Sequence, residues 1–445
     1  MGILASPAVS RCETSAATIT RRGRVALRIV GTLALCICVV GFAWGEQEAP
    51  HVLQINGSVY MAPLGANVYL VTTPAGNVVI DTGTIAQAPI ARKLLGEVNP
   101  GPVKYIILTH GHADHIGGIK LWKQEQTRII AQRNYVELLN YVKRLEGFFQ
   151  PRNAVAFNRA AEPAHPWAGN FAATIEPTIL FDQTYTFSLG GVRFELLSTP
   201  GETPDHLTVW IPKYRVAFIG DNYNGFGEPE PMSFPNLYPL RGSKPRWALD
   251  WIGSIDKVLA LRPEVVLSGH GAPIYGNAEI TRRLTRFRNA IQYVHDETVK
   301  GMNAGEDVYT LMRKIQLPPD ADMSESFGKV SWSVRGIYDA YAGWYDMNPS
   351  TMYERPPSSI FPDLVTLAGG PDALVKLASE RVKAGKAVDA LHLTDVVLAG
   401  DPHNRAALST RVEALTYLEE HSDNYIESDF LEYAIRQAQD AVKAP

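Results

Sequence analysis

The sequence predicts an α/β domain followed by an all-α domain, and three observations point to this fold class. Short apolar runs of strand length alternate with helical stretches over the first part of the chain. Acidic and histidine residues follow directly after several of these runs, where open α/β folds bind ligands. Beyond about residue 279, only helical periodicity continues. We therefore divide the chain into a leader of residues 1–45, an α/β domain of residues 46–278 and an all-α domain of residues 279–445.

The composition is that of a globular protein large enough for two domains. The chain has 445 residues, of which 46% are hydrophobic and 20% charged, and such a chain can bury a large core. Its formal net charge is −4. Removing residues 1–45 takes away five basic residues and one acidic residue, which leaves a charge of about −8. Because nucleic-acid binding needs a basic surface, no nucleic-acid partner is expected.

Residues 1–45 have the pattern of an export signal. Arginines at positions 21, 22, 24 and 28 precede an apolar stretch, residues 29–44. This stretch suits the core of a signal peptide better than a membrane-spanning helix, which needs about 20 residues. We expect the leader to be cleaved and the protein to be exported, as a periplasmic or secreted protein. An uncleaved membrane anchor is the alternative.

All three cysteines, Cys12, Cys36 and Cys38, lie in this leader. The mature chain would therefore have neither a disulfide nor a thiolate ligand for a metal ion. Any transition metal must be held by imidazole and carboxylate groups.

Strands and helices alternate between residues 51 and 278. The predicted strands are residues 68–71, 78–80, 105–108, 185–189, 192–197, 207–211, 216–219 and, as the last, 265–267. Gly190-Gly191 and Pro212-Lys213 lie between paired runs, as hairpin turns do. Helices are predicted at about 86–97, 133–146 and 246–260. After residue 279 the predicted helices are residues 280–303, 373–383, 388–398, 405–418 and 429–442.

Seven candidate metal ligands follow predicted strands. Four of them lie within six residues: His110, His112, Asp114 and His115. A loop that leaves a strand end can turn several such side chains toward one point. Glu202, Asp221 and His270 follow three later strands, and the strand ends on one side of a sheet converge. A single histidine or aspartate at a strand end is more often structural. A cluster accompanied by three further strand ends instead favours metal binding, with room for two ions.

Asp81 and the other histidines do not lie in such a cluster, so they are weaker candidates for metal ligands. Asp81 also ends a predicted strand, and we expect it to support the fold or a ligand rather than to bind metal. No role is assigned to the other histidines, which are His51, His165, His206, His295, His392, His403 and His421.

Around these residues the chain resembles a known family. The run from Thr109 to His115 resembles the signature of the metallo-β-lactamase superfamily, whose fold is an αββα sandwich. Glu202 stands where most members have a third histidine and where alkyl sulfatases have glutamate. Residues 236–242 resemble the Asn-Leu-Tyr-x-x-Arg-Gly segment of alkyl sulfatases. Residues 330–335 and 343–349 resemble the alkyl sulfatase dimerisation domain.

The resemblance implies two zinc ions per chain and assigns their ligands by position. One zinc ion would be bound by His110, His112 and Glu202, and the other by Asp114, His115 and His270, with Asp221 bridging the two. Asp114 and Asp221 would be the catalytic carboxylates. Arg241 would hold the sulfate, and Asn236 and Tyr238 would contact the substrate. The implied partners are a small anionic ester and a second copy of the chain, bound through the C-terminal helical domain.

Two departures from the better-known alkyl sulfatases leave the exact substrate open. Those enzymes have glutamate at the bridging position and a histidine-containing segment before Asn-Leu-Tyr, whereas this chain has Asp221 and a proline-rich segment, residues 227–235. They also carry a third, sterol-carrier-like domain that helps to accommodate alkyl chains, which we do not find among these 445 residues. A long detergent chain is therefore less favoured as the substrate.

The residue types suit hydrolysis of an anionic ester. Two zinc ions about 3.5–4 Å apart can share a water molecule and lower its pKa toward 7. The carboxylates of Asp114, Glu202 and Asp221 leave two Zn²⁺ ions with a net positive charge, which attracts an anion. A guanidinium group such as that of Arg241 matches a tetrahedral oxyanion. The sequence therefore predicts a zinc-dependent hydrolase that cleaves alkyl sulfate esters to alcohol and sulfate.

Two other functions stay open at this point. The same scaffold could hydrolyse a lactone, β-lactam, thioester or phosphoester. It could also be an inactive binding module that works through its helical domain, although the complete ligand set argues against this. Five aromatic residues would form either a dimer interface or the core of the helical domain: Trp332, Tyr338, Tyr341, Trp344 and Tyr345.

Overall fold

The computed structural model describes residues 50–157, 176–223, 232–244 and 246–444. The predicted export signal, residues 1–45, lies outside the described residues, as does most of the proline-rich segment before residue 236. Among the helices of the described ranges, none is both long enough and apolar enough to cross a membrane.

The first β-sheet has seven strands that follow one another in sequence order. They are β1 (Leu53–Gln54), β2 (Val59–Ala62), β3 (Val68–Thr73), β4 (Gly76–Ile80), β5 (Val103–Ile107), β6 (Arg128–Gln132) and β7 (Ile179–Phe181). Neighbouring strands are antiparallel as far as β4 and parallel from β4 to β7. Side chains alternate along β3, so that Tyr69 and Val71 enter one core while Val68 and Leu70 enter another.

The second sheet has six strands in the order β13-β12-β11-β10-β9-β8. They are β8 (Thr184–Leu189), β9 (Val192–Ser198), β10 (Leu207–Ile211), β11 (Val216–Gly220), β12 (Val265–Ser268) and β13 (Ile274–Tyr275). Only the pair β11 and β12 is parallel among the pairs described in this sheet. The predicted turn between β8 and β9 is confirmed, because Gly190 and Gly191 have φ of 55° and 79°, as a two-residue hairpin turn requires.

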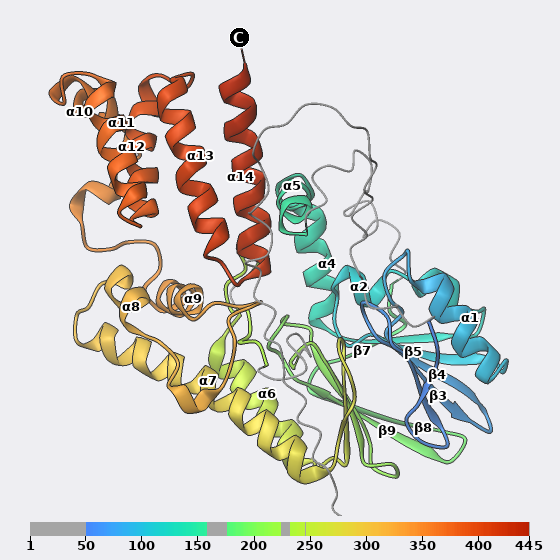
Figure 1. The fold of residues 1–445 in the computed structure, drawn as a ribbon. Coiled ribbons are helices and arrows are strands. Elements are labelled where there is room, and N and C mark those ends of the chain that lie inside the picture. The colour runs from blue at the N-terminus through green and yellow to red at the C-terminus, as the bar shows by residue number, and fades with distance from the viewer. Residues whose placement is uncertain (1–49, 158–175, 224–231, 245, 445) are drawn as a thin grey trace, which may run out of the picture. The chain divides into compact units, whose positions relative to one another are not determined.

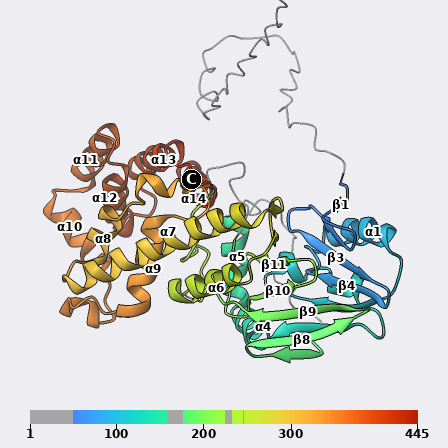
Figure 2. The same ribbon diagram turned by 90° about the horizontal axis from the view of Figure 1, so that it is seen from below.

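The two sheets pack face to face, and helices cover both outer faces (Figures 1 and 2). Apolar side chains of both sheets form the core between them, from Val59 and Ile107 on one side to Phe194 and Phe218 on the other. The first sheet is covered by α1 (Ala88–Val98), α3 (Ile119–Trp122) and α4 (Asn134–Arg144). The second is covered by α6 (Ala248–Ala260) and α7 (Asn277–Asn303). This αββα sandwich confirms the predicted fold class.

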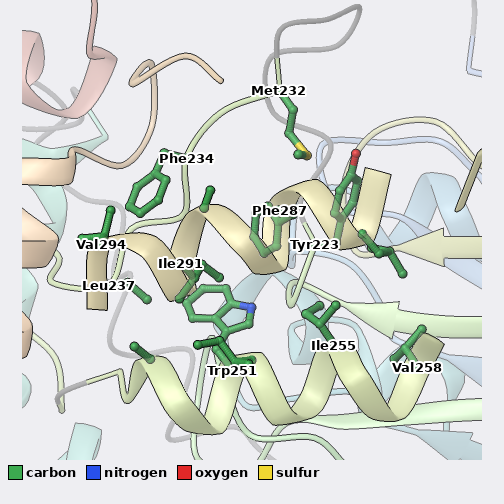
Figure 3. Packing of buried hydrophobic residues seen from close by; sticks show 14 of the residues in the cluster. Tyr223, Met232, Phe234, Leu237, Trp251, Ile255, Val258, Phe287, Ile291 and Val294 are labelled. Carbon is green, nitrogen blue, oxygen red and sulfur yellow. The ribbon is translucent and has the colours of Figure 1, made fainter. Parts of the chain in front are cut away.

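The core under α6 and α7 continues past residue 278. Figure 3 shows Trp251 of α6 beside Phe287 and Ile291 of α7, in a cluster of buried apolar residues. The same cluster contains Ile219 of β11 and, from the C-terminal part, Val334. Because both predicted domains contribute to one core, they are packed together as one unit over residues 49–445. The boundary at residue 278 stays a prediction.

The C-terminal part is entirely helical after α7. Its α-helices are α8 (Val308–Lys314), α9 (Val330–Ala342), α10 (Phe361–Leu367), α11 (Pro371–Lys383), α12 (Ala387–Gly400), α13 (Arg405–Glu420) and α14 (Tyr425–Lys443). Helices α11 to α14 pack in sequence, and α14 also packs against α5 (Glu146–Ala156) of the α/β part, as Figure 1 shows. The predicted all-α region is therefore confirmed.

The structure differs from the predicted elements where an element is short or broken. β12 is not the last strand, because β13 pairs antiparallel with it. The single helix predicted at 133–146 is followed without a loop by α5, and the break falls at Leu145, which has φ −111° and ψ 24°. β6, β7 and α9 were not predicted. Two- to five-residue strands show too few alternations for a sequence pattern to identify them.

Candidate metal centre

Strand ends of both sheets position the seven predicted ligands. His110 and His112 lie in the loop after β5, and Asp114 and His115 lie in the short helix α2 (Ala113–Ile116) that follows. Glu202 comes after β9, Asp221 directly after β11, and His270 after β12. Because β11 and β12 are parallel neighbours, Asp221 and His270 emerge at the same edge of the second sheet.

The ligand atoms of these residues converge on two groups. The donor atoms of His110, His112 and Asp221 lie within 4.8 Å of one another, and those of Asp114, His115 and His270 do so as well. His110 Nε2 lies 3.0 Å from His112 Nδ1, and Asp114 Oδ2 lies 3.3 Å from His270 Nε2 and 3.5 Å from His115 Nε2. Two atoms bound to one tetrahedral zinc ion at about 2.1 Å are about 3.4 Å apart. The spacing therefore fits a metal ion in each group.

Asp221 faces both groups. Its Oδ2 lies 3.7 Å from His110 Nε2 and 3.3 Å from His270 Nε2, and its Oδ1 lies 3.4 Å from His115 Nε2. Among the described residues, neither Asp221 Oδ1 nor His115 Nε2 has a hydrogen-bond partner, although both are buried. Buried polar atoms without partners are costly. A cation between the two would satisfy both, which is the strongest sign that this cluster is a metal site.

Hydrogen bonds on the far side of two imidazoles, those of His115 and His270, determine which ring nitrogen faces the site. His115 Nδ1 lies 2.9 Å from Asp81 Oδ2, and His270 Nδ1 bonds to the carbonyl oxygen of Gly65. Both contacts leave Nε2 free to point inward. Asp81 also accepts from the backbone N–H and the hydroxyl of Thr109, each at 2.8 Å. Asp81 therefore holds a ligand and the ligand loop, and its φ of 57° shows that the backbone is held in an unusual conformation to do so.

Two glycines make the close approach possible. A Cβ atom on Gly269 would lie 2.0 Å from Asp221 Oδ1 and 2.7 Å from a carbon of the His115 ring. Gly220, which precedes Asp221, has φ of 47°, and a Cβ atom there would lie 2.4 Å from His206 Nε2. A larger residue in place of Gly269 would push the candidate ligands Asp221 and His115 apart, and one in place of Gly220 would displace His206.

Glu202 lies at the edge of the first group and is shared with an arginine. Its Oε1 is 3.7 Å from His112 Nδ1, while its Oε2 accepts a hydrogen bond from Arg246 at 2.5 Å. Both side chains are about 95% buried. Burial raises the pKa of Glu202 to about 7 although Arg246 opposes the shift. Arg246 also donates to the backbone oxygen of Asn236 at 2.7 Å, so the pair ties the metal site to the segment that leads to Arg241.

The pKa values show how strongly the cluster favours positive charge. Burial lowers the pKa of His270, but Asp221 and Asp114 outweigh it and raise the pKa to about 10. The same two carboxylates overcome burial and hold the pKa of His115 well above its ordinary value. In contrast, burial keeps the pKa of His110 well below its ordinary value. Since imidazole binds metal in its neutral form, a dication would replace the protons on His115 and His270.

His206 belongs to the site although the sequence indicated no role for it. Its Nε2 accepts a hydrogen bond from the backbone N–H of Asp221 at 3.1 Å, and its ring stacks on that of His110 with centroids 5.2 Å apart. Its Nδ1 lies 3.3 Å from the Thr199 hydroxyl, which fits the tautomer with the proton on Nδ1. Burial lowers the pKa of His206 to about 3, so the ring stays neutral and Nε2 remains an acceptor. The one signal for His206 in the sequence was its place directly before a predicted strand, which is β10.

The structure places two of the three predicted substrate residues in the wall of one cavity and the third elsewhere. Arg241 and Asn236 line a cavity of about 360 Å³ that includes five of the seven ligands. Arg152 of α5 holds the Arg241 loop, because its guanidinium donates at 2.9 Å to the backbone oxygens of Leu240 and Arg241. Tyr238 is not among the residues that line this cavity. Its hydroxyl lies 3.5 Å from Asp339 Oδ2 of α9, so the role predicted for it in substrate contact is not supported.

The cavity has a cationic end and an apolar remainder. Burial lowers the pKa of His112, and the charges of Arg241 and Arg246 lower it further, so both arginines lie near the metal-site end. Lys244 also lines the cavity but pairs with Glu137 of α4 at 3.6 Å. The other walls are formed largely by apolar and aromatic residues, which are Leu138, Tyr141, Val142, Phe149, Phe157, Phe327, Tyr425 and Ile426. Such a cavity suits a ligand with an anionic group next to the metal site and an apolar group beyond it.

Comparison with known proteins agrees with this geometry. Residues 61–270 match the family model of the metallo-β-lactamase superfamily, and residues 309–439 match that of alkyl sulfatase dimerisation. Residues 61–270 are therefore of the metallo-β-lactamase superfamily type. The helical part of the chain is of the alkyl sulfatase dimerisation type. Likeness to the superfamily implies a metal site, in agreement with the two groups of ligands.

Several curated relatives are named as alkylsulfatases. A linear primary-alkylsulfatase from a Pseudomonas species is 29% identical over 78% of this chain and 69% of the relative. The alkyl/aryl-sulfatase of Saccharomyces cerevisiae is 26% identical over 84% of this chain and 62% of the relative. An (R)-specific secondary-alkylsulfatase from Pseudomonas is 26% identical, and 59% of it is covered. The chain thus spans about three fifths to two thirds of the length of these relatives.

A solved structure has the same fold. The stereoselective inverting sec-alkylsulfatase from Pseudomonas superposes with a TM-score of 0.77, at 22% sequence identity, over 87% of this chain and 66% of that protein. The likeness therefore extends through both the sandwich and the helical part.

The contacts of His206 predict a loss of metal affinity when its ring is removed. His206→Ala leaves the N–H of Asp221 unpaired and removes the ring behind His110, so both ligands lose their support. We expect metal affinity to fall about 10- to 100-fold, as is typical when a group that orients ligands is lost. Competitive titration with a chromophoric chelator measures this.

The matched control is His403→Ala, because His403 is exposed and lies in the loop between α12 and α13. The control should bind metal as the unaltered protein does. Unchanged affinity in His206→Ala would show that the Asp221 backbone needs no support from the imidazole.

Proposed function

We propose that the protein is a dinuclear zinc hydrolase that cleaves alkyl sulfate esters to an alcohol and sulfate. The observation that carries this proposal is the position of Asp221, which faces two groups of nitrogen and oxygen ligands at one end of a cavity with cationic and apolar walls. Relatives named as alkylsulfatases support the choice of ester.

The ligand chemistry supports zinc. Imidazole and carboxylate groups suit this ion, and three protein ligands with an open position are typical of its catalytic sites. We assign His110, His112 and Glu202 to one ion, and Asp114, His115 and His270 to the other, with Asp221 shared between them. Two zinc ions held in this way would supply an activated water at neutral pH.

The charges around the cavity support an anionic substrate. Arg246 pairs with Glu202. The guanidinium compensates part of the negative charge of this carboxylate, which therefore offsets less of the positive charge of the two ions. Arg241 adds a second cation. It has no carboxylate within ion-pair distance among the described residues, and its guanidinium donates to Asn153 Oδ1 at 3.4 Å. A guanidinium held by a neutral amide can offer its fork to a sulfate. Asn236 lines the same cavity as Arg241.

The main alternative is another hydrolase on the same scaffold, acting on a lactone, β-lactam, thioester or phosphoester. The cationic end of the cavity disfavours the neutral esters and amides among these. A panel that compares alkyl sulfates with alkyl phosphates, lactones and a chromogenic β-lactam separates the two proposals. Turnover of a phosphate or a lactone, but of no sulfate, would establish the alternative.

The proposed centre predicts metal content directly. The purified protein should contain close to two zinc ions per chain by elemental mass spectrometry. A strong chelator should abolish activity, and added zinc should restore it, because both groups of ligands must be filled to share one water. Active protein with a metal content near zero would contradict the proposal.

The proposed role of Arg241 predicts a loss that depends on the substrate. Arg241→Ala removes a charge-assisted contact to the sulfate, which contributes roughly 1.5–3 kcal/mol, so kcat/KM for an alkyl sulfate should fall about 10- to 150-fold. Arg241→Lys keeps the charge but loses the fork and should recover only part of this. Zinc content should stay unchanged in both variants.

The control for Arg241 is Arg193→Ala on β9, whose side chain is 62% exposed and pairs with Glu195. It should behave as the unaltered protein. A second comparison uses a neutral ester or lactone, on which Arg241→Ala should have little effect. Equal losses on the sulfate and on the neutral substrate would show that Arg241 supports the structure instead of holding the anion.

We also propose a homodimer formed through the C-terminal helical part. The five aromatic residues predicted for an interface or a core fall into both classes, because Tyr338 packs against the core around α6 and α7, whereas Trp344 is 76% exposed. Exposed apolar residues continue after Trp344, with Met347 80% and Leu367 83% exposed. An apolar surface of this kind is typical of an interface.

Sedimentation should show a dimer at micromolar concentration, and Trp344→Glu should shift it toward the monomer. Leu249→Glu, at a half-exposed leucine of α6, is the control and should leave the dimer intact. A monomer in the unaltered protein would contradict the proposal. We further propose that residues 1–45 direct export of the chain, which detection of the mature N-terminus in a periplasmic or secreted fraction would test.

A further inference from the structure

One wall of the cavity comes from residues more than 180 positions after the main ligand cluster. Tyr425 and Ile426 are the first residues of α14, and Phe327 lies in the segment before α9. They line the same cavity as Leu138 and Tyr141 of α4. The cavity is therefore completed by the helical part of the same chain and is not formed by the sandwich alone.

The two pieces of this wall are joined to each other. Asn424 caps α14 through its side-chain oxygen, and its Nδ2 donates to the carbonyl oxygens of Glu325 and Phe327 at 2.6 and 2.9 Å. The backbone N–H of Tyr425 donates to Ser326 at 3.0 Å. The rings of Phe327 and Tyr425 stack with centroids 5.7 Å apart. Because Asn424 is only 1% exposed, these contacts are shielded from water and hold the wall as one piece.

The wall is also joined to the segment that carries the substrate residues. The backbone of residues 324–328 pairs with that of residues 232–234, where Ser324 and Gly328 donate to Met232 and Phe234 at 2.9 and 3.1 Å. A Cβ atom on Gly328 would lie 2.2 Å from the carbonyl oxygen of Pro235, so the two backbones touch immediately before Asn236. The wall therefore has a defined position relative to Arg241.

This wall and the candidate metal site face one cavity. Tyr425 lines it together with Glu202, Arg241 and Asp114. Burial raises the pKa of Tyr425, and the charges of Asp429, Glu202 and Arg241 have smaller effects. Ile426 is 4% exposed and apolar. On the opposite side, α5 contributes Phe149 and packs beside α14 (Figure 1).

We propose that Phe327, Tyr425 and Ile426 form the specificity-determining wall for the organic group of the substrate. This inference rests on the proposed function, since it assigns the alkyl part of an ester whose sulfate is held by Arg241. The preferred substrate then has an apolar group, which lies between α4 and α5 on one side and the first turn of α14 on the other. The helical part selects the substrate while the sandwich performs the reaction.

The test is a chain-length series of linear alkyl sulfates, from ethyl to dodecyl, assayed with the zinc-loaded full chain. In the unaltered protein, kcat/KM should rise by up to about fourfold for each methylene group that the wall covers, mainly through KM. Ile426→Ala and Tyr425→Ala should flatten this rise, so that the ratio of kcat/KM on dodecyl sulfate to kcat/KM on ethyl sulfate falls. Ile426→Phe places a larger side chain in the part of the cavity that the alkyl group would occupy. It should lower kcat/KM for the long alkyl sulfates more than for the short ones.

Controls separate a specificity role from a general loss of structure. Tyr425→Phe keeps the ring and should keep the chain-length profile, and Tyr309→Ala, at a 60% exposed tyrosine of α8, should behave as the unaltered protein. Equal losses on ethyl and dodecyl sulfate in the Ile426 and Tyr425 variants, or an unchanged profile in Ile426→Phe, would overturn the proposal.

Failure of the proposed function would look different. If the unaltered protein hydrolyses no sulfate ester of the series, the sulfatase proposal is wrong, and calorimetric binding of the same sulfates then tests the wall by itself. Affinity that rises with chain length and is lost in Ile426→Phe would support the wall. Affinity that is independent of chain length in the unaltered protein would refute it.

Discussion

The carboxylate of Asp221 is the group on which the geometry of the site depends. It is buried within 3.7 Å of three imidazole nitrogens, and a buried carboxylate is stable only when positive charge or hydrogen bonds compensate it. Each surrounding feature serves that requirement. Gly269 lets the carboxylate approach His115, Gly220 takes the positive φ that turns it inward, and His206 holds its backbone N–H. Parallel pairing of β11 with β12 brings Asp221 and His270 to one edge.

The pair of Glu202 and Arg246 connects the candidate metal site to the segment that leads to Arg241. Removing either partner would leave an unpaired charge in the interior, which is far more costly than the pair itself is stabilising. Arg246 also bonds the backbone of Asn236, and Arg152 bonds the backbone of Arg241 from α5. The loop that carries the candidate anion-binding residue is therefore held from both sides. A loop held in this way can present a guanidinium at a defined distance from the metal site, as tight recognition of a tetrahedral anion requires.

The helical part belongs to the same functional unit as the sandwich. Residues 324–328 pair with the backbone just before Asn236, and α14 packs against the helix that anchors the Arg241 loop. The core under α6 and α7 contains residues from both parts. Substitutions in α14 can therefore alter a cavity whose candidate metal ligands come from residues 110–270. The exposed aromatic and aliphatic residues after α9 remain on a different surface, available for a second copy of the chain.

The sequence by itself predicted the sandwich and the helical region, and both are confirmed, because alternation of period two in β9 and helical periodicity after residue 279 are local signatures. It also singled out the seven candidate ligands, four of which lie within six residues and need no knowledge of distant parts of the chain. Only the tertiary structure showed the contacts of Arg246 and His206, brought Tyr425 to the cavity and placed Tyr238 outside the residues that line it. The physical reason is that their partners are distant in sequence: Arg246 meets Glu202 44 residues away, and Tyr238 meets Asp339 101 residues away. Contacts of that kind depend on how sheets and helices pack, which no local pattern of residues records.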